Sequence, residues 1–543
     1  MLELTPLGGL GEIGLNCMML EHHGERMLID CGLMFPRGDY PGVELVVPDF
    51  KWLLEEPHRL KGVVLTHAHE DHVGALPWLI SRVAVPIYGT RFTIGLARHR
   101  LEEAGLLGEL RVVEPRENFR VGNEFAVELM RVTHSIPDAV AVSVRTTSGS
   151  VIHSGDFKLD LEPVDGQLTD LTRMGELGEE GVGLLLSDST GAEQKGSTPS
   201  EARVRETFDR LIGGAKGRVI VGMFGSHLHR AQHLLALAAR LGRKVVLAGR
   251  SLQRNVQLAT DAELMKLPQG LLVPYDFASQ LPAHETLVLA AGAQGEPRSA
   301  LSNMLNPEPG PLRARPGDTL LLSSRVIPGN EILVAEMIDR FVARGVKVVH
   351  PGIEPLIHVS GHAARDEQRK LIQTVKPQAF VPIHGERRML AAHLEVAQEA
   401  GVAHRVLAID GDVLGLDDEG LSSLRQVTAG RVLSWRDSDD ELPLPSLDER
   451  RALQNGVVVI CLALDTTTGK VLAGPAVSGR GLTAEEGAAL TLAEAHARDA
   501  IDALGPLKAD DAKVREELSE SVRKALRQTS GSRAAVVPLV LKV

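Results

Sequence analysis

The fold is decided by one stretch of the sequence, Val63-Val64-Leu65-Thr66-His67-Ala68-His69-Glu70-Asp71-His72. Its apolar start predicts a buried strand, and three imidazoles and two carboxylates follow within six residues. In the pattern H-x-H-x-D-H, His67 and His69 leave a strand end on the same side, whereas Asp71 and His72 lie on the turn behind them and can face a second ion. Neutral imidazole and carboxylate suit Zn²⁺ or Mn²⁺. The alternative is a solvated polar turn, but such turns rarely hold histidine at this density.

The composition narrows the class of protein. A chain of 543 residues is too long for one core, so we expect two to four domains. The formal net charge of −12 argues against nucleic-acid binding over the whole surface, and an aromatic content of 3% argues against a base-stacking platform. A polyanionic substrate would therefore need a local basic groove, helix N-termini or metal ions.

The cysteines and the N-terminus indicate the compartment. Cys17, Cys31 and Cys461 form no C-x-x-C motif and are odd in number, which excludes a disulfide framework and a thiolate zinc site. The first residues, Met1-Leu2-Glu3-Leu4, form no basic leader, and no apolar run approaches the ~20 residues that span a bilayer. We expect a soluble cytoplasmic protein without a membrane partner.

Further polar side chains follow apolar strands after the histidine cluster. His134 follows the strand predicted over 125–132, Asp156 follows the strand predicted over 150–153, and Asp188 follows Leu184-Leu185-Leu186. Ligands gather where strand ends meet loops in layered α/β folds. A single residue of this kind is more often a cap, but in this order His134 and Asp156 supply a third ligand and a bridge between two ions.

Two features precede the cluster. The glycine-rich segment Leu7-Gly8-Gly9-Leu10-Gly11-Glu12-Ile13-Gly14 superficially resembles a dinucleotide-binding turn, but a strand rather than an amphipathic helix follows it. We expect a tight hairpin that lets backbone approach the site. Asp30 ends the next predicted strand, where it is either a loop cap or an acceptor that orients a metal-bound histidine.

The chain divides into alternating kinds of segment. Residues 1–200 form the first part of a metal-binding α/β domain, and residues 201–345 show the strand–helix alternation of a second, doubly wound α/β domain. Over 346–430, predicted strands are again followed by histidines, so we expect the first domain to resume there after an insertion. Residues 431–450 combine acidic residues with prolines and predict a linker, and residues 451–543 predict a small α+β domain for oligomerisation or substrate presentation.

The candidate ligands fall into two sets with one shared member. One ion would be bound by His67, His69 and His134. The other ion would be bound by Asp71, His72 and His384, and Asp156 would bridge the two ions. Each ion keeps an open position for water, and two ions would lower the pKa of a shared water to roughly 7. Such a site hydrolyses esters, amides or phosphodiesters without choosing among them.

A second histidine motif points to the substrate. His358-Val359-Ser360-Gly361-His362 places a hydroxyl, backbone N–H groups and imidazoles at the start of a predicted helix. Helix N-termini bind phosphate, and His362 could protonate a departing sugar oxygen as a general acid. The alternative is an ordinary helix cap.

Taken together, these residues resemble the β-CASP nucleases of the metallo-β-lactamase superfamily, and the wording around them is similar to that of the bacterial ribonuclease J family. The resemblance is dense over residues 1–430 and looser over the C-terminal segment. It is carried by Asp30, His67-Ala-His-Glu-Asp-His72, His134-Ser-Ile-Pro-Asp138, Asp156, Ser187-Asp-Ser-Thr190, Gly249-Arg-Ser251, Gly292-Ala-Gln-Gly-Glu-Pro297, His358-Val-Ser-Gly-His362 and Pro382-Ile-His-Gly-Glu386.

The resemblance implies an αββα core interrupted by a β-CASP domain and two zinc ions per subunit, with manganese as an alternative or additional activator. It implies single-stranded RNA as substrate, 5′→3′ exonuclease action from a 5′-monophosphate end, additional endonuclease activity, and a role in RNA maturation and mRNA decay. Asp71 and Asp156 would hold the ions, and Asp188 would position His362. Ser360 and Gly361 would match the phosphate pocket, with His358, Ser226 and His227 as further contacts. We also expect a homodimer through the C-terminal domain, and other RNA-decay proteins as partners.

Three other functions compete with this one. A lactonase or thioesterase of the same superfamily would need neither the long insertion nor the loop over 358–362. A non-catalytic scaffold is disfavoured because every candidate ligand is present. A DNA-directed β-CASP nuclease is the closest rival in chemistry, since a metal site does not sense the 2′-hydroxyl.

Overall fold

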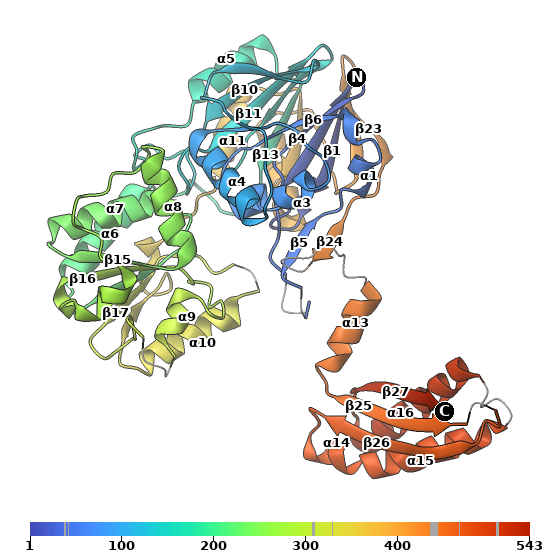
Figure 1. Cartoon of the computed structure of the whole chain (residues 1–543). Helices are drawn as coiled ribbons and strands as arrows, with labels where there is room; N and C mark the ends of the chain where they lie inside the picture. Colours follow the sequence, from blue (N-terminus) through green and yellow to red (C-terminus); the bar gives the residue numbers. More distant parts are fainter. Residues whose placement is uncertain are drawn as a thin grey trace. The chain divides into compact units, whose positions relative to one another are not determined.

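The computed structural model describes residues 1–36, 40–41, 43–306, 310–327, 329–434, 444–465, 467–505 and 510–543. The chain forms two compact units (Figure 1). The first unit contains Met1–Phe35 and Leu45–Val432, and the second contains Pro36–Glu44 and Leu433–Val543.

Two β-sheets form the centre of the first unit. One has the strand order β23-β22-β1-β3-β4-β6-β7-β8, and the other has the order β21-β19-β13-β12-β11-β10-β9. The strands of the first sheet are β1 (Leu2–Gly8), β3 (Cys17–His22), β4 (Glu25–Ile29), β6 (Leu60–Val64), β7 (Ile87–Gly89), β8 (Leu110–Val112), β22 (Asp412–Asp417) and β23 (Gly420–Gln426). Those of the second are β9 (Asn118–Val121), β10 (Phe125–Arg131), β11 (Val140–Thr146), β12 (Gly149–His153), β13 (Leu184–Asp188), β19 (Ala379–Ile383) and β21 (His404–Arg405).

The alternation of apolar side chains stacks these sheets face to face. In β3, Met18 and Leu20 enter the core shared by both sheets, whereas Met19 points to the opposite face. That outer face packs against α3 (Leu76–Ile80) and α4 (Arg91–Glu103). The outer face of the second sheet packs against α5 (Leu171–Glu180), α11 (Arg365–Val375) and α12 (Arg387–Glu399). The predicted αββα core is confirmed.

The glycine-rich segment is the expected tight connection. It joins the antiparallel neighbours β1 and β3, and its strand β2 (Leu10–Gly11) pairs with β20 (Gly385–Glu386), directly after His384. Its backbone therefore lies beside the predicted site. The remaining short elements of this part are β5 (Leu45–Pro48), α1 (Lys51–Leu54), the 3₁₀ turn η1 (Pro57–Arg59) and α2 (Glu70–Val73).

The inserted domain is a parallel sheet covered on both faces (Figure 1). Its strand order is β15 (Lys244–Ala248), β16 (Thr286–Ala290), β14 (Val219–Gly222), β17 (Thr319–Leu322) and β18 (Lys347–Val349). Val219 and Val221 face α6 (Glu201–Gly213), α7 (Leu228–Arg240) and α8 (Arg250–Asp261), whereas Ile220 faces α9 (Ala300–Met304) and α10 (Glu331–Val342). The doubly wound architecture is confirmed; 3₁₀ turns occupy Tyr275–Gln280, Ala283–Glu285 and Pro355–Ile357.

The second unit contains an α+β module. Strands β25 (Val457–Leu464) and β26 (Val471–Arg480) form the predicted hairpin, and β27 (Ala535–Lys542) pairs parallel with β25. Helices α15 (Leu490–Ala503) and α16 (Asp511–Ser530) contribute to its apolar core, preceded by the short helix α14 (Ala484–Ala488). The sequence pattern over 483–504 predicts one helix, whereas the structure has two helices there, α14 and α15.

The predicted linker over 431–450 is only partly visible. Residues 435–443 lie outside the described residues, and the flanking parts form β24 (Arg431–Ser434) and α13 (Leu444–Leu453). Its acidic and proline-rich composition did not predict these elements. Over the described part of the chain, no helix combines the length and the apolar character needed to cross a bilayer.

Candidate active site

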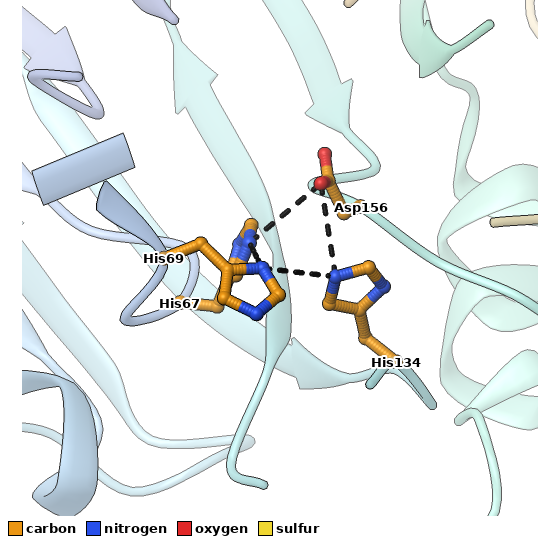
Figure 2. A group of neighbouring side chains, drawn as sticks. All are labelled: His67, His69, His134 and Asp156. Atoms are coloured by element: carbon orange, nitrogen blue, oxygen red, sulfur yellow. Dashed lines mark hydrogen bonds and ion pairs between the residues drawn. The ribbon is translucent and has the colours of Figure 1, made fainter. Parts of the chain in front are cut away.

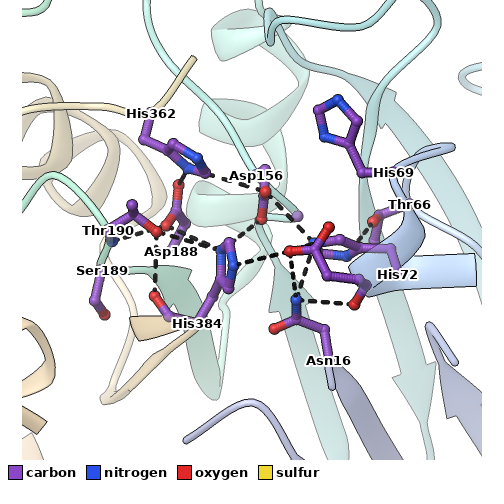
Figure 3. Close-up of polar contacts among 12 residues, drawn as sticks. Asn16, Thr66, His69, His72, Asp156, Asp188, Ser189, Thr190, His362 and His384 are labelled. Atoms are coloured by element: carbon purple, nitrogen blue, oxygen red, sulfur yellow. Dashed lines mark hydrogen bonds and ion pairs between the residues drawn. The ribbon is translucent and has the colours of Figure 1, made fainter. Parts of the chain in front are cut away.

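Strand ends from both sheets bring the predicted ligands together. Strand β6 of the first sheet ends just before Thr66, and α2 then carries Asp71 and His72. From the second sheet, His134 follows β10, Asp156 follows β12, Asp188 ends β13 and His384 follows β19. Their side chains converge in one place (Figures 2 and 3). Residues far apart in the sequence therefore form one site because their strands end at the same edge of the sandwich.

The first cluster consists of His67, His69, His134 and Asp156 (Figure 2). Nδ1 of His69 lies 3.1 Å from Nε2 of His67 and 3.2 Å from Nε2 of His134. Burial lowers the pKa of all three imidazoles, to about 4 in the case of His69. They are neutral at physiological pH, so their lone pairs are available to a metal ion.

The second cluster consists of Asp71, His72 and His384, and Figure 3 labels its two histidines. Oδ2 of Asp71 lies 3.8 Å from Nε2 of His72 and 3.5 Å from Nε2 of His384. Burial opposes the charging of His72, but Asp156, Asp30 and Asp71 outweigh burial and raise the pKa of His72 to about 10. Three carboxylates thus make this pocket attractive to positive charge.

Asp156 belongs to both clusters. Its Oδ1 lies 2.9 Å from Nδ1 of His384, and its Oδ2 lies 3.4 Å from Nε2 of His72 and 3.6 Å from Nε2 of His67. The same Oδ2 lies 3.8 Å from Nε2 of His134. The buried Asp156 carboxylate therefore contacts imidazoles of both clusters, and its role as a bridge between two ions stays a prediction.

The donor set fits two divalent metal ions. Nε2 of His384 is buried and, within the described residues, accepts or donates no hydrogen bond, although the Asp71 carboxylate faces it. An orphaned buried nitrogen costs free energy unless a ligand satisfies it. Imidazole nitrogens and carboxylate oxygens at this spacing are the ligands that zinc and manganese take in proteins.

Polar residues behind the clusters fix their orientation. Oδ1 of Asp30 accepts a hydrogen bond from the Thr66 amide and Oδ2 accepts one from the Thr66 hydroxyl, both at 2.8 Å, and Oδ2 also lies 2.7 Å from Nδ1 of His72. On the other side, Nδ1 of His134 lies 2.8 Å from the carbonyl oxygen of Gly361. These contacts orient Nε2 of His134 toward His69 and Nε2 of His72 toward Asp156.

His362 and Asp188 form a pair at the edge of the site (Figure 3). Nδ1 of His362 lies 2.8 Å from Oδ2 of Asp188, which is buried, whereas the His362 side chain is 21% exposed. The same imidazole lies 3.9 Å from Oδ2 of Asp156. His362 is therefore held beside the clusters, with its other ring nitrogen unengaged by Asp188.

His358 and His227 lie on a different network, between the inserted domain and the main domain. Nη1 of Arg230 donates to Nδ1 of His358 at 2.8 Å, and Nη2 donates to Oε1 of Glu201 at 2.5 Å. Nε2 of His227 lies 3.3 Å from the same Oε1, while its buried Nδ1 has no hydrogen-bond partner among the described residues. Neither histidine belongs to the metal clusters.

Comparison with known proteins assigns the chain to a family. Family models match in order: the metallo-β-lactamase superfamily over 10–176, the ribonuclease J β-CASP domain over 216–341, the Zn-dependent metallo-hydrolase RNA specificity domain over 346–407 and the ribonuclease J C-terminal domain over 445–543. Ribonuclease J of Thermus thermophilus is 36% identical over 99% of this chain and 95% of its own length. The chain belongs to the ribonuclease J family.

A second relative and a solved structure are also similar to this chain. Ribonuclease J of Synechocystis is 42% identical over 89% of this chain and 76% of its own length. A solved structure of a protein of unknown function from Enterococcus faecalis shares the fold at 17% identity, with a TM-score of 0.54, and covers 76% of this chain and 99% of its own. The predicted metal-dependent nuclease, a hydrolase acting on RNA, is confirmed.

Three residues that contact the candidate site residues of this ribonuclease J family member were not predicted from the sequence. Nδ2 of Asn16 lies 3.0 Å from both Nε2 of His72 and the carbonyl oxygen of Asp71. Arg230 and Glu201 anchor His227 and His358. An asparagine in a glycine-rich turn and an arginine within an amphipathic helix carry no local signal of such roles, because their partners lie on other segments.

Proposed function

We propose that the chain is a two-metal 5′→3′ exoribonuclease that prefers single-stranded RNA with a 5′-monophosphate and also cleaves internally. The observation that carries this proposal is the Asp156 carboxylate shared by two imidazole clusters, with the His362–Asp188 pair beside it. We propose two zinc ions per subunit, with manganese as the alternative or additional activator.

The residues of the site have separate proposed roles in hydrolysis. His67, His69 and His134 would hold one ion, Asp71, His72 and His384 the other, and Asp156 both. When bound, the ions supply a nucleophile from water near neutral pH and neutralise the charge of the attacked phosphate. Asp71, whose side chain is 30% exposed, would orient the attacking water.

His362 is the proposed general acid. Asp188 accepts from Nδ1 of His362, which leaves Nε2 to carry the proton that the departing 3′-oxygen needs. Asp188 also accepts a hydrogen bond from the Thr190 amide through Oδ1 at 2.9 Å, so the pair is held by the backbone. Protonation of the 3′-oxygen would leave the phosphate on the 5′ side of the next nucleotide, and the products would be 5′-phosphates.

The loop over 358–362 is the proposed phosphate pocket. Oγ of Ser360 accepts from the His362 amide at 3.1 Å and keeps its own proton to donate. At Gly361 a Cβ would come within 2.8 Å of the His134 ring, so only glycine lets this loop lie so close to His134. Ser226 and His227 would add contacts from the inserted domain, where Nδ1 of His227 has no hydrogen-bond partner among the described residues.

End-labelled substrates test the proposal. The purified protein with Zn²⁺ or Mn²⁺ is offered 5′-monophosphate RNA, 5′-triphosphate RNA and matching single-stranded DNA. We expect mononucleotides to appear preferentially from the monophosphate RNA. Equal release of mononucleotides from the monophosphate and triphosphate RNAs would refute the preference for a 5′-monophosphate. Equal release from the single-stranded DNA would favour a DNA-directed nuclease. A chelator should stop all release.

We also propose a homodimer formed through the C-terminal domain, a cytoplasmic location and association with other RNA-decay proteins. The module's sheet leaves apolar side chains in solvent, with Leu472 at 54%, Leu539 at 48% and Leu541 at 65% exposure. Such side chains on one small module favour burial against a second copy. Light scattering of the intact protein should give a dimer mass; a monomer mass would contradict this arrangement.

A further inference from the structure

A second group of side chains that could hold a metal ion lies outside the site described above. It consists of His22, His23 and Glu124, whose ligand atoms all lie within 4.8 Å of one another. His22 ends β3, His23 follows in the turn to β4, and Glu124 precedes β10 in the opposite sheet. The group therefore joins one hairpin of each sheet of the sandwich.

The geometry of this group suits an ion. Oε2 of Glu124 lies 2.9 Å from Nδ1 of His22 and 3.0 Å from Nδ1 of His23. Ligands of a tetrahedral zinc ion lie about 3.3 Å apart, given bonds of about 2.0–2.1 Å. Both imidazoles present the same ring nitrogen to the same carboxylate oxygen, so the three atoms that would bind a metal already lie close together.

The surrounding structure holds these side chains in place. Oγ of Ser148 lies 3.0 Å from Nε2 of His22, and this contact leaves Nδ1 to face the carboxylate. Glu25 accepts hydrogen bonds from the amides of Asn123, at 2.7 Å, and of Glu124, at 3.2 Å, which fixes the opposite turn. Partners behind a ligand that set its orientation are typical of metal sites.

His23 adopts an unusual backbone conformation. Its φ of 45° lies in the left-handed region, where residues other than glycine are uncommon, and Gly24 follows with a φ of 82°. This turn brings the two imidazole rings to a centroid distance of 3.9 Å. The exposed His23, at 61%, leaves the position open to ions from solvent.

We propose that His22, His23 and Glu124 bind a separate divalent transition-metal ion, such as Zn²⁺, that cross-links the two sheets. The site lies at the end of the sandwich opposite to the active site, because β4 runs from the His22 turn to Asp30 and β10 runs from Glu124 towards His134. A strand of this length spans roughly 17–20 Å. The ion would therefore stabilise the fold without taking part in hydrolysis.

Zinc counting tests this site. Wild-type protein, His23→Asn and Glu124→Gln are dialysed against the same micromolar ZnCl₂, and bound zinc per chain is measured. Asparagine tolerates the left-handed conformation, so His23→Asn keeps the turn. His284→Asn is the matched control, because His284 is also exposed, at 68%, and lies beside a glutamate, Glu285.

We expect both site variants to bind one zinc ion fewer per chain than the wild type and the control, whatever number the active site holds. Added zinc should raise the melting temperature of the wild type more than that of either variant, while turnover of RNA stays unchanged. Equal zinc counts in all four proteins would overturn the proposal and leave a hydrogen-bonded turn.

Discussion

Oδ2 of Asp30 lies 2.7 Å from Nδ1 of His72, and the carboxylate is 1% exposed. The same oxygen accepts a hydrogen bond from the Thr66 hydroxyl. Asp30 touches neither Asp71 nor His384 in the described contacts, yet it sets the direction in which His72 presents its other nitrogen. Asp30 also has a φ of 64°, a conformation that asparagine tolerates.

We therefore predict that Asp30→Asn lowers zinc affinity about 10–100-fold, the usual cost of losing a partner behind a ligand. The chain should remain folded because the left-handed backbone is retained. Competition with a chromophoric chelator measures the affinity, and Asp261→Asn, on an exposed face of α8, is the control. Unchanged affinity would show that His72 needs no carboxylate behind it.

Asp71→Ala should abolish turnover while RNA binding largely persists. Asp71 faces His72 and His384 at one side of the site, whereas the proposed phosphate contacts lie on the loop over 358–362. Fluorescence anisotropy with single-stranded RNA and release of labelled nucleotides measure the two properties separately. Parallel loss of both would instead implicate misfolding, which circular dichroism would reveal.

Glu201→Gln should destabilise the protein by about 3–5 kcal/mol, because the buried Arg230 would lose its charged partner. The side chain of Glu201 is 7% exposed and that of Arg230 is 1% exposed. Glu206→Gln is the matched control on the same helix, since its pair with Arg203 is exposed and worth less than about 1 kcal/mol. Urea unfolding measures both. Equal effects would contradict a structural role for the buried pair.

Asp410→Asn should stabilise the protein, increasingly so as the pH rises. Burial, followed by the nearby Glu12, raises the pKa of Asp410 to about 7, from 3.8 in the unfolded chain. A raised pKa means that the stability contributed by the protonated group is complete below 3.8 and is lost as the pH rises through about 7.

The asparagine variant stays neutral and keeps an oxygen to accept from the Leu10 amide. Its advantage over the wild type should therefore grow by about 2 kcal/mol between about pH 5.5 and about pH 8. Urea unfolding at both pH values, with the exposed Asp418→Asn as control, measures it. An advantage independent of pH would show that Asp410 does not titrate in this range.

Local sequence signals predicted the elements that carry the chemistry. An apolar strand followed by a ligand is visible at Leu65–His67, Val132–His134 and His153–Asp156, and the structure brings these exits together. The doubly wound insertion was visible because its strands alternate with helices. Both depend on short-range periodicity, which a single sequence displays.

Features that depend on long-range partners were not predicted. Asn16 meets His72 only because β1 and β3 fold the glycine-rich turn over α2. In the sequence, Arg230 is only one polar residue of an amphipathic helix. Its role becomes apparent in the structure, where the loop that carries His358 packs against it. The apolar run over 83–88 predicts a strand, but β7 begins only at Ile87, after Pro86, which cannot donate a hydrogen bond to a neighbouring strand.

The order of the ligands along the chain has a consequence for biosynthesis. His384 lies beyond the whole inserted domain, yet it faces both Asp71 and Asp156. A nascent chain emerging from the ribosome therefore carries the first cluster long before it can complete the second. Under the proposed two-metal mechanism, chains that terminate before His384 would lack the last imidazole of the second cluster, and we expect such fragments to be inactive on RNA.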